Sequence, residues 1–352
     1  MRARDLGIII GGLPPGPNDA LTDVAGVEVG YETIVRGEDV RTGVTVILPF
    51  EGREPLFAAI HRLNGNGEMT GSHYIDEFGM LTSPIAITNT HSVGTVHEAL
   101  VRYSVERGYV SGEFSSWALP VVAETWDGML NDINGFHVKP HHVEAAIASA
   151  KSGPIDEGNV GGGTGMICHG FKGGTGTASR VVPEAAGGYT VGVLVQANHG
   201  RRERLRITGV PVGAAIGPDE VPLPGVHADG QGSIITVVAT DAPLLPYQCK
   251  RLAQRAALGI GRTGGLGEDS SGDIIICFAT GNRPVVVLGD PPPVDVPIRM
   301  LQNAYINPLF AAAVDATEEA IVNALLAAGT TTGYGGATAY RLPPERLAQL
   351  LR

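Results

Sequence analysis

The serine at position 233 is the residue whose setting most clearly suggests chemistry. Ser233 follows Gly232 at the end of a glycine-rich segment, 229–232, and it precedes the mostly apolar run 234–239. A serine after glycine can attack the preceding carbonyl, because glycine has no Cβ to obstruct a strained approach. Water would then hydrolyse the resulting ester. We therefore predict that the chain cleaves itself between Gly232 and Ser233.

The new N-terminus would carry both a nucleophile and its own base. An α-amino group has an unperturbed pKa of roughly 7.7–8.0, so an appreciable fraction is neutral near neutral pH. The neutral amine can accept the proton of the Ser233 hydroxyl, and such a site needs no histidine. The alternative is an ordinary serine at the start of a strand, which composition alone favours. The chemistry makes Ser233 our candidate nucleophile.

Other motifs for nucleotide binding or hydrolysis are weaker. The G-x-G-x-x-G spacing at 259–264 follows a helical pattern instead of a strand, so a helix end and turn is the better interpretation. The glycine-rich run 158–180 could cradle an anion, but we favour glycines that pack close to another strand. Ser92 lies in a sequence that approaches a nucleophile elbow without its first glycine, so it fits better as a helix N-cap.

Histidine and cysteine spacing predicts no metal site and no cofactor. His141 and His142 are adjacent, so on a helix they point in different directions. His137 and His141 have helical spacing, but Pro140 lies between them and no glutamate follows His137 as in zinc proteases. Three cysteines lie far apart in the sequence: Cys168, Cys249 and Cys277. Their odd number and spacing predict no disulfide framework, so we expect a reducing compartment and a cytoplasmic location.

Composition bounds the class of protein. The chain has 352 residues, 43% hydrophobic and 17% charged, which predicts a sizeable buried core in one large domain or two ordinary ones. The net charge of −11 argues against a nucleic-acid partner. The one compact basic cluster, within 201–206, reads as a solvated loop. We expect neither a membrane span nor a signal peptide, because apolar runs near the required length are missing.

Short apolar runs alternate with helical patterns, which predicts an α/β fold with sheets covered on both faces. The expected strands are 27–34, 43–48, 84–88, 118–124, 189–197, 233–240, 273–279 and 284–288. The expected helices are 93–107, 140–151, 243–257 and 317–328. Asp241 and Thr317 are candidate caps for the last two. The segment 199–232 shows no periodicity and reads as a long connecting loop that leads to Ser233.

Several long motifs, in order, resemble the DmpA-type aminopeptidases, which include the L-aminopeptidase/D-esterases and the β-peptidyl aminopeptidases. They include "PPGPNDALTDVAGVEVGYETI" (14–34), "NGNGEMTGSHYIDEFGMLTSPIAITNTHSVGTVHEAL" (64–100), "PVVAETWDGMLNDINGFHV" (120–138) and "GSIITVVATDAPLLPYQCKRLAQRAALGIGRTGG" (232–265). The resemblance covers nearly the whole chain. It implies one four-layer αββα sandwich, similar also to the ornithine acetyltransferases, that spans 1–352 and cleaves into an α chain (1–232) and a β chain (233–352).

The resemblance also implies roles for individual residues. Asn198, in "VQANHG", matches an oxyanion donor, and an asparagine amide at a strand end suits that task. Ser271 and Asp273, in "SGD", match a motif that assists the nucleophile through hydrogen bonds, with Asp where some relatives have Glu. Glu124 matches an acidic position that could hold a substrate ammonium. Trp126 stands where some members have tyrosine, so a hydroxyl is lost there. The alternatives are a turn residue for Asn198 and solvated carboxylates for the two acids.

The sequence therefore predicts a self-processing serine aminopeptidase or amidase. It would release N-terminal L-, D- or β-amino acids from small peptides, amides or esters through an acyl-enzyme on Ser233. The alternatives are an acyltransferase like the ornithine acetyltransferases, which use threonine as nucleophile, a hydrolase of non-peptide oligoamides, and an uncleaved binding protein. Family likeness further implies a homo-oligomer of cleaved αβ units.

Overall fold

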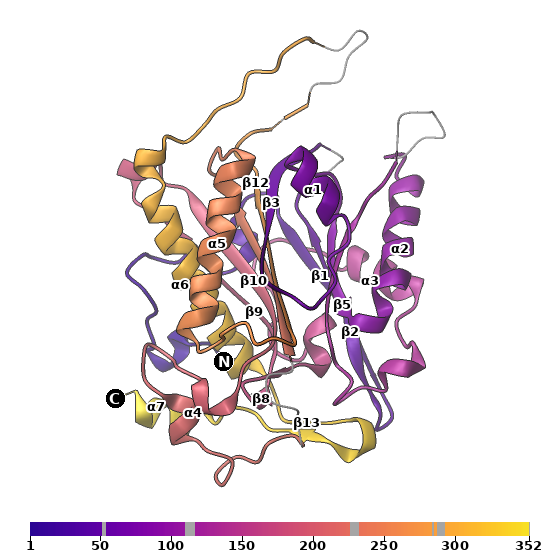
Figure 1. The fold of residues 1–352 in the computed structure, drawn as a ribbon, viewed down its shortest axis with the longest axis vertical. Coiled ribbons are helices and arrows are strands. Elements are labelled where there is room, and N and C mark those ends of the chain that lie inside the picture. Colours follow the sequence, from indigo (N-terminus) through magenta and orange to yellow (C-terminus); the bar gives the residue numbers. More distant parts are fainter. Residues whose placement is uncertain (51–53, 110–116, 226–231, 284, 287–292, 352) are drawn as a thin grey trace.

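The protein forms four layers, helices–sheet–sheet–helices, in a computed structural model that describes residues 1–50, 54–109, 117–225, 232–283, 285–286 and 293–351 (Figure 1). Two sheets pack face to face, and each has a helix pair on its outer face. The α/β class and the αββα order predicted from sequence are both confirmed. In the described residues, no helix is long and apolar enough to cross a membrane.

The smaller sheet has four strands in the order β1-β2-β5-β6. Their bounds are β1 Glu28–Arg36, β2 Val40–Leu48, β5 Ile85–Asn89 and β6 Val121–Thr125. The pairs are antiparallel except for β5 and β6, which run parallel. Helices α2 (Val93–Glu106) and α3 (Pro140–Ala148) cover the outer face, where Val96 and Leu100 pack against Val46 and Val122.

The larger sheet has six strands in the order β4-β3-β12-β11-β10-β9. Their bounds are β4 Met80–Leu81, β3 Leu56–Gly65, β12 Ser271–Ala279, β11 Gly232–Thr240, β10 Thr190–Asn198 and β9 Gly174–Val181. Only β11 and β12 run parallel among the pairs of this sheet. Helices α5 (Pro246–Arg262) and α6 (Asn307–Ala327) cover its outer face (Figure 1).

Strand alternation divides the core of the larger sheet into two sides. On β11, Ile235 and Val237 point toward the smaller sheet, whereas Ile234 and Val238 point toward α5 and α6. Both faces are buried, which explains why these strands read as nearly continuous apolar runs. This alternation also fixes the side on which each functional side chain of the same strands lies.

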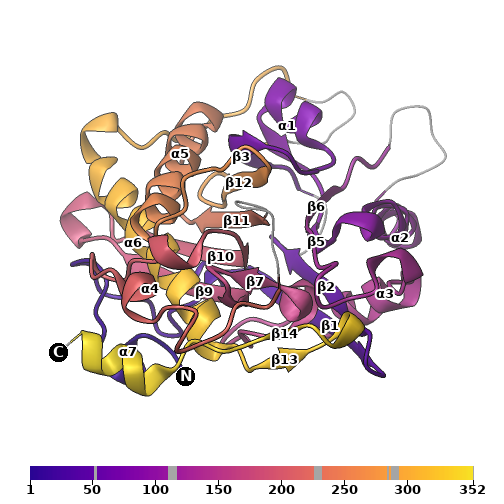
Figure 2. The same ribbon diagram turned by 60° about the horizontal axis from the view of Figure 1, so that its bottom comes forward.

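The smaller elements lie mainly at one end of the sandwich, with the hairpin β13–β14 and helix α7 in view in Figure 2. Their bounds are α1 Ser72–Phe78, β7 Ile167–Cys168, β8 Phe171–Lys172, α4 Val212–Ala215, β13 Thr331–Thr332, β14 Thr338–Ala339 and α7 Pro344–Leu350. The predicted connection after β10 is confirmed through residue 225, with only short elements in it.

Three expected elements differ in the structure. No strand forms at 285–286, which is a bend, while 284 and 287–288 lie outside the described residues. Helix α6 begins ten residues before Thr317, whose hydroxyl donates to the Ala313 carbonyl inside the helix instead of capping it. α6 is buried on nearly every side, so its sequence lacks the amphipathic pattern that marks a helix start. Helix α5 begins at Pro246, and the Asp241 carboxylate accepts from the Thr190 backbone instead.

Strands β3 and β9 were not predicted. β9 is built from glycine, threonine and serine, and its glycines allow close packing: a Cβ on Gly176 would lie 2.0 Å from the Ala320 carbonyl oxygen of α6. Gly174 approaches Gly158 equally closely, which confirms the packing interpretation of this glycine-rich run.

The interpretation of 201–206 as a solvated loop is wrong for Arg202. That side chain is buried, lies 3.5 Å from the centre of the Phe171 ring, and donates to the carbonyls of Ile216 and Val221. Backbone carbonyls of an irregular segment need donors when they are buried, and a guanidinium supplies several at once. Arg202 therefore holds the long connecting segment against the domain.

Candidate active site

Ser233 lies at the start of β11, buried, with its hydroxyl beside the peptide that precedes it. Ser233 Oγ donates to the Gly232 carbonyl oxygen at 2.8 Å and accepts from the Gly272 backbone N–H at 3.1 Å. The chain is crowded here, because a Cβ on Gly232 would lie 2.3 Å from the Asn198 carbonyl oxygen. Glycine is therefore required before Ser233 by close backbone approach, which gives the glycine–serine pair a structural reason.

Asn198 ends β10 directly opposite Ser233 in the antiparallel ladder. Directly opposed residues present their side chains on the same face, within about 4.5–5.5 Å at Cβ. The Asn198 carboxamide is fixed at both ends: its Oδ1 accepts from the Ile167 N–H at 2.7 Å, and its Nδ2 donates to the Trp126 carbonyl at 2.9 Å. An amide nitrogen has two hydrogens, so a second donor is left for another acceptor.

Ser271 and Asp273 form a hydrogen-bonded pair on β12. Ser271 Oγ donates to Asp273 Oδ1 at 2.6 Å. Burial raises the pKa of Asp273 to about 6, and the hydrogen bond from Ser271 opposes part of that rise. Ser271 and Asp273 lie on the same face of β12 as Ile275, which packs toward the outer helices. Ser233 lies on the same face of β11 as Ile235, which packs toward the smaller sheet.

The pair and the nucleophile side chain thus lie on opposite faces of the sheet. Gly272, between Ser271 and Asp273, provides the hydrogen bond that joins this motif to the Ser233 hydroxyl in the part of the chain described. Strand β11 runs parallel to β12, with Ser233 paired to Gly272 and Ile234 paired to Asp273. The Asp273 carboxylate also accepts a backbone hydrogen bond from Ile234, the residue that follows Ser233.

Glu124 lies on β6 of the smaller sheet, and its carboxylate lies beside the chain at Gly67 and Glu68. Its Oε1 accepts from the Glu68 N–H at 3.0 Å, and Thr90 Oγ1 donates to its Oε2. Burial raises the pKa of Glu124, and both hydrogen bonds oppose the rise. A Cβ on Gly67 would lie 3.2 Å from Glu124 Oε1 and 3.2 Å from the Gly272 Cα. Gly67 therefore lies between the Glu124 carboxylate and Gly272, the residue whose N–H donates to Ser233 Oγ.

The sequence matches peptidase family S58 over residues 19–339. The chain belongs to peptidase family S58. It is 50% identical to the β-peptidyl aminopeptidase BapA of Sphingosinicella microcystinivorans, with 100% of this chain and 92% of that protein covered. The predicted aminopeptidase class, with the hydrolytic chemistry of a serine N-terminal-nucleophile enzyme, is thereby confirmed.

Solved structures agree with the S58 assignment. The Burkholderia sp. β-aminopeptidase superposes with a TM-score of 0.92 at 52% identity, over 100% of this chain and 98% of that one. The L-aminopeptidase D-Ala-esterase/amidase of Ochrobactrum anthropi, described as a variant of the Ntn hydrolase fold, gives a TM-score of 0.90 at 46% identity, with 100% and 98% coverage.

Trp126 contributes to this S58 site through its backbone. Its carbonyl accepts from Asn198, while the indole is 38% exposed and packs over Gly128, where a Cβ would lie 2.5 Å from the ring. The carbonyl role was not visible in the sequence, because any residue supplies a carbonyl.

Sequence reasoning assigned no role of their own to four positions that shape the site: Gly67, Glu68, Thr90 and Gly272, the last of which lies inside the SGD motif. The signal for Gly67 and Gly272 was their place beside polar motifs, since glycine permits a close backbone approach. A pocket of about 310 Å³ opens next to Gly67. Its lining combines Met69 and Ile274 with Glu68 and Asp76. Glu68 in this lining donates its backbone N–H to Glu124, whereas Glu124 itself and Ser233 do not belong to the lining.

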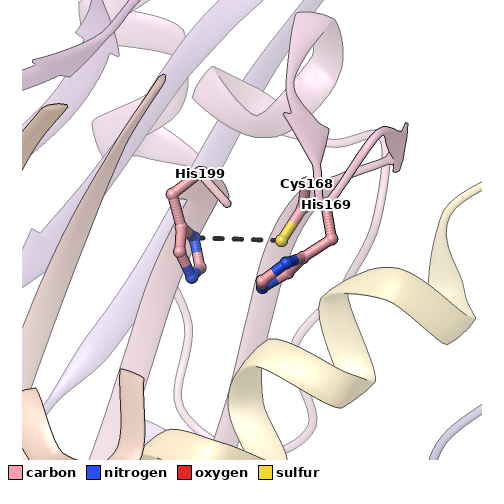
Figure 3. Close-up of side chains that lie close together, drawn as sticks. All are labelled: Cys168, His169 and His199. Carbon is pink, nitrogen blue, oxygen red and sulfur yellow. Dashed lines mark hydrogen bonds between the residues drawn. The ribbon is translucent and has the colours of Figure 1, made fainter. Parts of the chain in front are cut away.

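Another cluster could hold a metal ion. Cys168, His169 and His199 place one donor atom each within 4.8 Å of one another (Figure 3). Residue spacing predicts no metal site here, because Cys168 and His199 are 31 positions apart in the chain. The prediction that the protein binds no metal can therefore be tested at this cluster.

Proposed function

We propose that Ser233 is the nucleophile both of self-cleavage and of aminopeptidase turnover. The observation that carries this proposal is the position of Ser233 Oγ, 2.8 Å from the carbonyl oxygen of the peptide it would cleave. The N–H of Gly272 donates to the same hydroxyl, which orients it. A nucleophile held beside its target needs little further ordering to reach the transition state.

In maturation, Ser233 Oγ attacks the Gly232 carbonyl carbon, and the Gly232–Ser233 C–N bond breaks to give an ester. Water then hydrolyses the ester, which leaves a carboxylate on Gly232 and a free amine on Ser233. The products are an α chain, 1–232, and a β chain, 233–352.

In turnover, the freed amine accepts the proton of its own hydroxyl as Oγ attacks the substrate carbonyl. The second N–H of Asn198 Nδ2 donates to the oxyanion. Ser271 and Asp273 hold the amine, since they lie on the side of the sheet away from the hydroxyl and Asp273 is joined to the next backbone position, Ile234. The amine leaves, and water releases the acyl group.

Glu124 binds the ammonium of the substrate's N-terminal residue. A buried carboxylate that receives only two hydrogen bonds keeps acceptor capacity for a third partner. A cation at this position would also offset the cost of burying the ionised carboxylate. The substrates are small peptides, amides and esters with a free N-terminus. Names of relatives support both β- and L-amino acids in the first position.

The proposed nucleophile is tested by intact mass and by Edman sequencing of purified protein. Wild-type protein should give two chains, the shorter beginning Ser-Ile-Ile-Thr, and Ser233→Ala should give one. An intact wild-type chain with full activity would refute cleavage as the source of the nucleophile. An intact chain without hydrolase activity would favour a binding protein instead.

The proposed ammonium site is tested with paired substrates. Glu124→Gln should raise KM for p-nitroanilides of free β- and L-amino acids, while N-acetylated substrates should be poor for the wild type. Glu68→Gln is the matched control, because Glu68 contributes its backbone N–H to this contact. Equal turnover of acetylated and free substrates would point to an oligoamide hydrolase, and acyl transfer to an added amine in preference to water would point to an acyltransferase.

We also propose that the cleaved αβ units assemble into a cytoplasmic homo-oligomer. Family likeness supports the assembly, and three buried free cysteines support a reducing location. The net charge of −11 supports the absence of a nucleic-acid partner. Sedimentation velocity on the purified protein measures the assembly directly.

A further inference from the structure

A second set of reactive side chains, separate from the proposed catalytic groups, lies near Asn198. Cys168 ends β7, His169 lies in the turn between β7 and β8, and His199 follows β10 (Figure 3). All three side chains are buried. Thiol and imidazole groups are the ligands that borderline-soft divalent metals prefer, and their convergence in a protein interior needs an explanation.

The spacing of the donors suits one tetrahedral ion. Zinc–sulfur bonds are about 2.3 Å and zinc–nitrogen bonds about 2.0–2.1 Å, so sulfur and nitrogen around one tetrahedral ion lie about 3.6 Å apart. Cys168 Sγ and His199 Nδ1 are 3.8 Å apart. The third donor, from His169, lies within 4.8 Å of the other two.

Each histidine has a buried ring nitrogen without a partner among the described residues. His169 Nδ1 lies 3.0 Å from the Arg201 carbonyl, which can only accept, so Nδ1 carries the hydrogen and Nε2 has a free lone pair. His169 Nε2 is buried without a hydrogen bond, so its lone pair is available to an ion. His199 Nε2 is buried without a hydrogen bond as well, but the nitrogen of that ring beside Cys168 Sγ is Nδ1. An unpaired buried acceptor destabilises a folded protein, and a bound ion would satisfy the one on His169. A backbone carbonyl that fixes the tautomer is a recurrent feature of metal-binding histidines.

The rings are held in place by glycines. A Cβ on Gly200 would lie 2.3 Å from the His169 ring, and a Cβ on Gly265 would lie 2.9 Å from the His199 ring. Neither glycine could therefore be replaced without moving a ring. The two imidazoles are positioned before any ion arrives, which reduces the entropy lost on binding.

Ion binding changes the protonation of Cys168. Binding must displace the thiol proton: Cys–SH and M²⁺ give Cys–S⁻–M²⁺ and H⁺.

We propose that Cys168, His169 and His199 bind one borderline-soft divalent transition metal ion, of which Zn²⁺ is the probe. The ion would fasten the β7–β8 hairpin to the end of β10. That junction already contains a hydrogen bond from the His169 backbone N–H to the His199 backbone carbonyl at 2.7 Å. It also contains the bond from the Ile167 N–H to the Asn198 carboxamide. The ion is thus a positioning device for Asn198, a role that rests on the proposed function.

Metal content tests the site. The full chain is produced in zinc-supplemented medium, so that the ion is present while the site folds, then desalted and measured by mass spectrometry of the elements. Wild type should retain about one Zn²⁺ per chain. Cys168→Ala and His169→Gln should retain at least about tenfold less zinc, because the loss of even an outer-shell partner typically costs about 10–100-fold in metal affinity. Cys249→Ala is the matched control, because it removes another buried free thiol and leaves the three ligands intact.

A second readout does not depend on the variants folding. Wild type produced with Co²⁺ should show a thiolate-to-cobalt charge-transfer band and visible ligand-field bands. Absence of these bands, metal-free wild type, or equal zinc in wild type and Cys168→Ala would each overturn the site. Asn198→Ala separates the two proposals, since it should keep the zinc while losing turnover. An Asn198→Ala enzyme with normal kcat and normal zinc would refute the role of Asn198 and leave the metal site intact.

Discussion

Gly232→Ala tests whether the close backbone approach before Ser233 sets the rate of self-cleavage. The added Cβ would lie 2.3 Å from the Asn198 carbonyl oxygen, whereas real Cβ contacts are essentially never under 3.0 Å. Either the peptide or the end of β10 must therefore move by about 0.7 Å, the difference between these two distances. The atom that obstructs the Cβ belongs to the backbone, so no side-chain rotation relieves the contact.

A displacement of this size acts directly on the reacting geometry. Misplacement by about 1 Å can cost on the order of 10² in rate, so we expect cleavage of Gly232→Ala to slow by tens to a hundredfold. Time courses of cell-free synthesis, resolved by denaturing electrophoresis and intact mass, measure the conversion of full-length chain into 1–232 and 233–352.

Gly217→Ala is the matched control, because Gly217 lies in the same connecting segment and an added Cβ there meets nothing within 4 Å. It should cleave at the wild-type rate. Gly232→Ala that also cleaves at the wild-type rate would show that the crowded approach to Asn198 has no part in the reaction.

Three further outcomes follow from the site. Asn198→Ala in cleaved protein should lower kcat by about 10²–10³ with little change in KM, as measured by p-nitroanilide kinetics, and an unchanged kcat would remove Asn198 from the mechanism. Asp273 must be ionised to hold the Ser233 amine, so kcat/KM should fall further as pH drops through about 6, below the fall that protonation of the amine itself causes near its ordinary pKa of roughly 7.7–8.0. Ser271→Ala removes a bond that lowers the Asp273 pKa, so it should move this lower limb to higher pH, and an unmoved limb would contradict the pairing. Burial raises the pKa of Asp127 to about 7. The protonated carboxyl therefore stabilises the fold fully below the unfolded-state pKa near 3.8, and this contribution is lost as pH rises to about 7. Asp127→Asn should therefore gain melting temperature relative to wild type between pH 4 and 8, and a melting-temperature difference that stays constant over this range would contradict the reasoning.

The sequence by itself was sufficient for the elements that carry the nucleophile. Strands β10, β11 and β12 are apolar over most of their length because both faces are buried, so local composition marks them. The Gly232–Ser233 junction was visible where a glycine-rich segment meets an apolar run, whereas Asn198 was identified through the resemblance to the DmpA-type aminopeptidases. Helix α6 and strand β9 were not visible, since α6 is buried on nearly every side and β9 is built from glycines that fit against that helix.

Only the tertiary structure decided how the functional groups meet. Residue types could not show that the Trp126 carbonyl holds Asn198, because that contact uses a backbone atom. Alternation along β12, once the sheet was assembled, placed Ser271 and Asp273 on the face opposite the Ser233 hydroxyl. Cys168 and His199 are 31 residues apart, and the pairing of a hairpin with a strand end makes them neighbours. Sequence periodicity reports which face of its own element a side chain occupies, whereas contacts between elements depend on packing that no local pattern encodes.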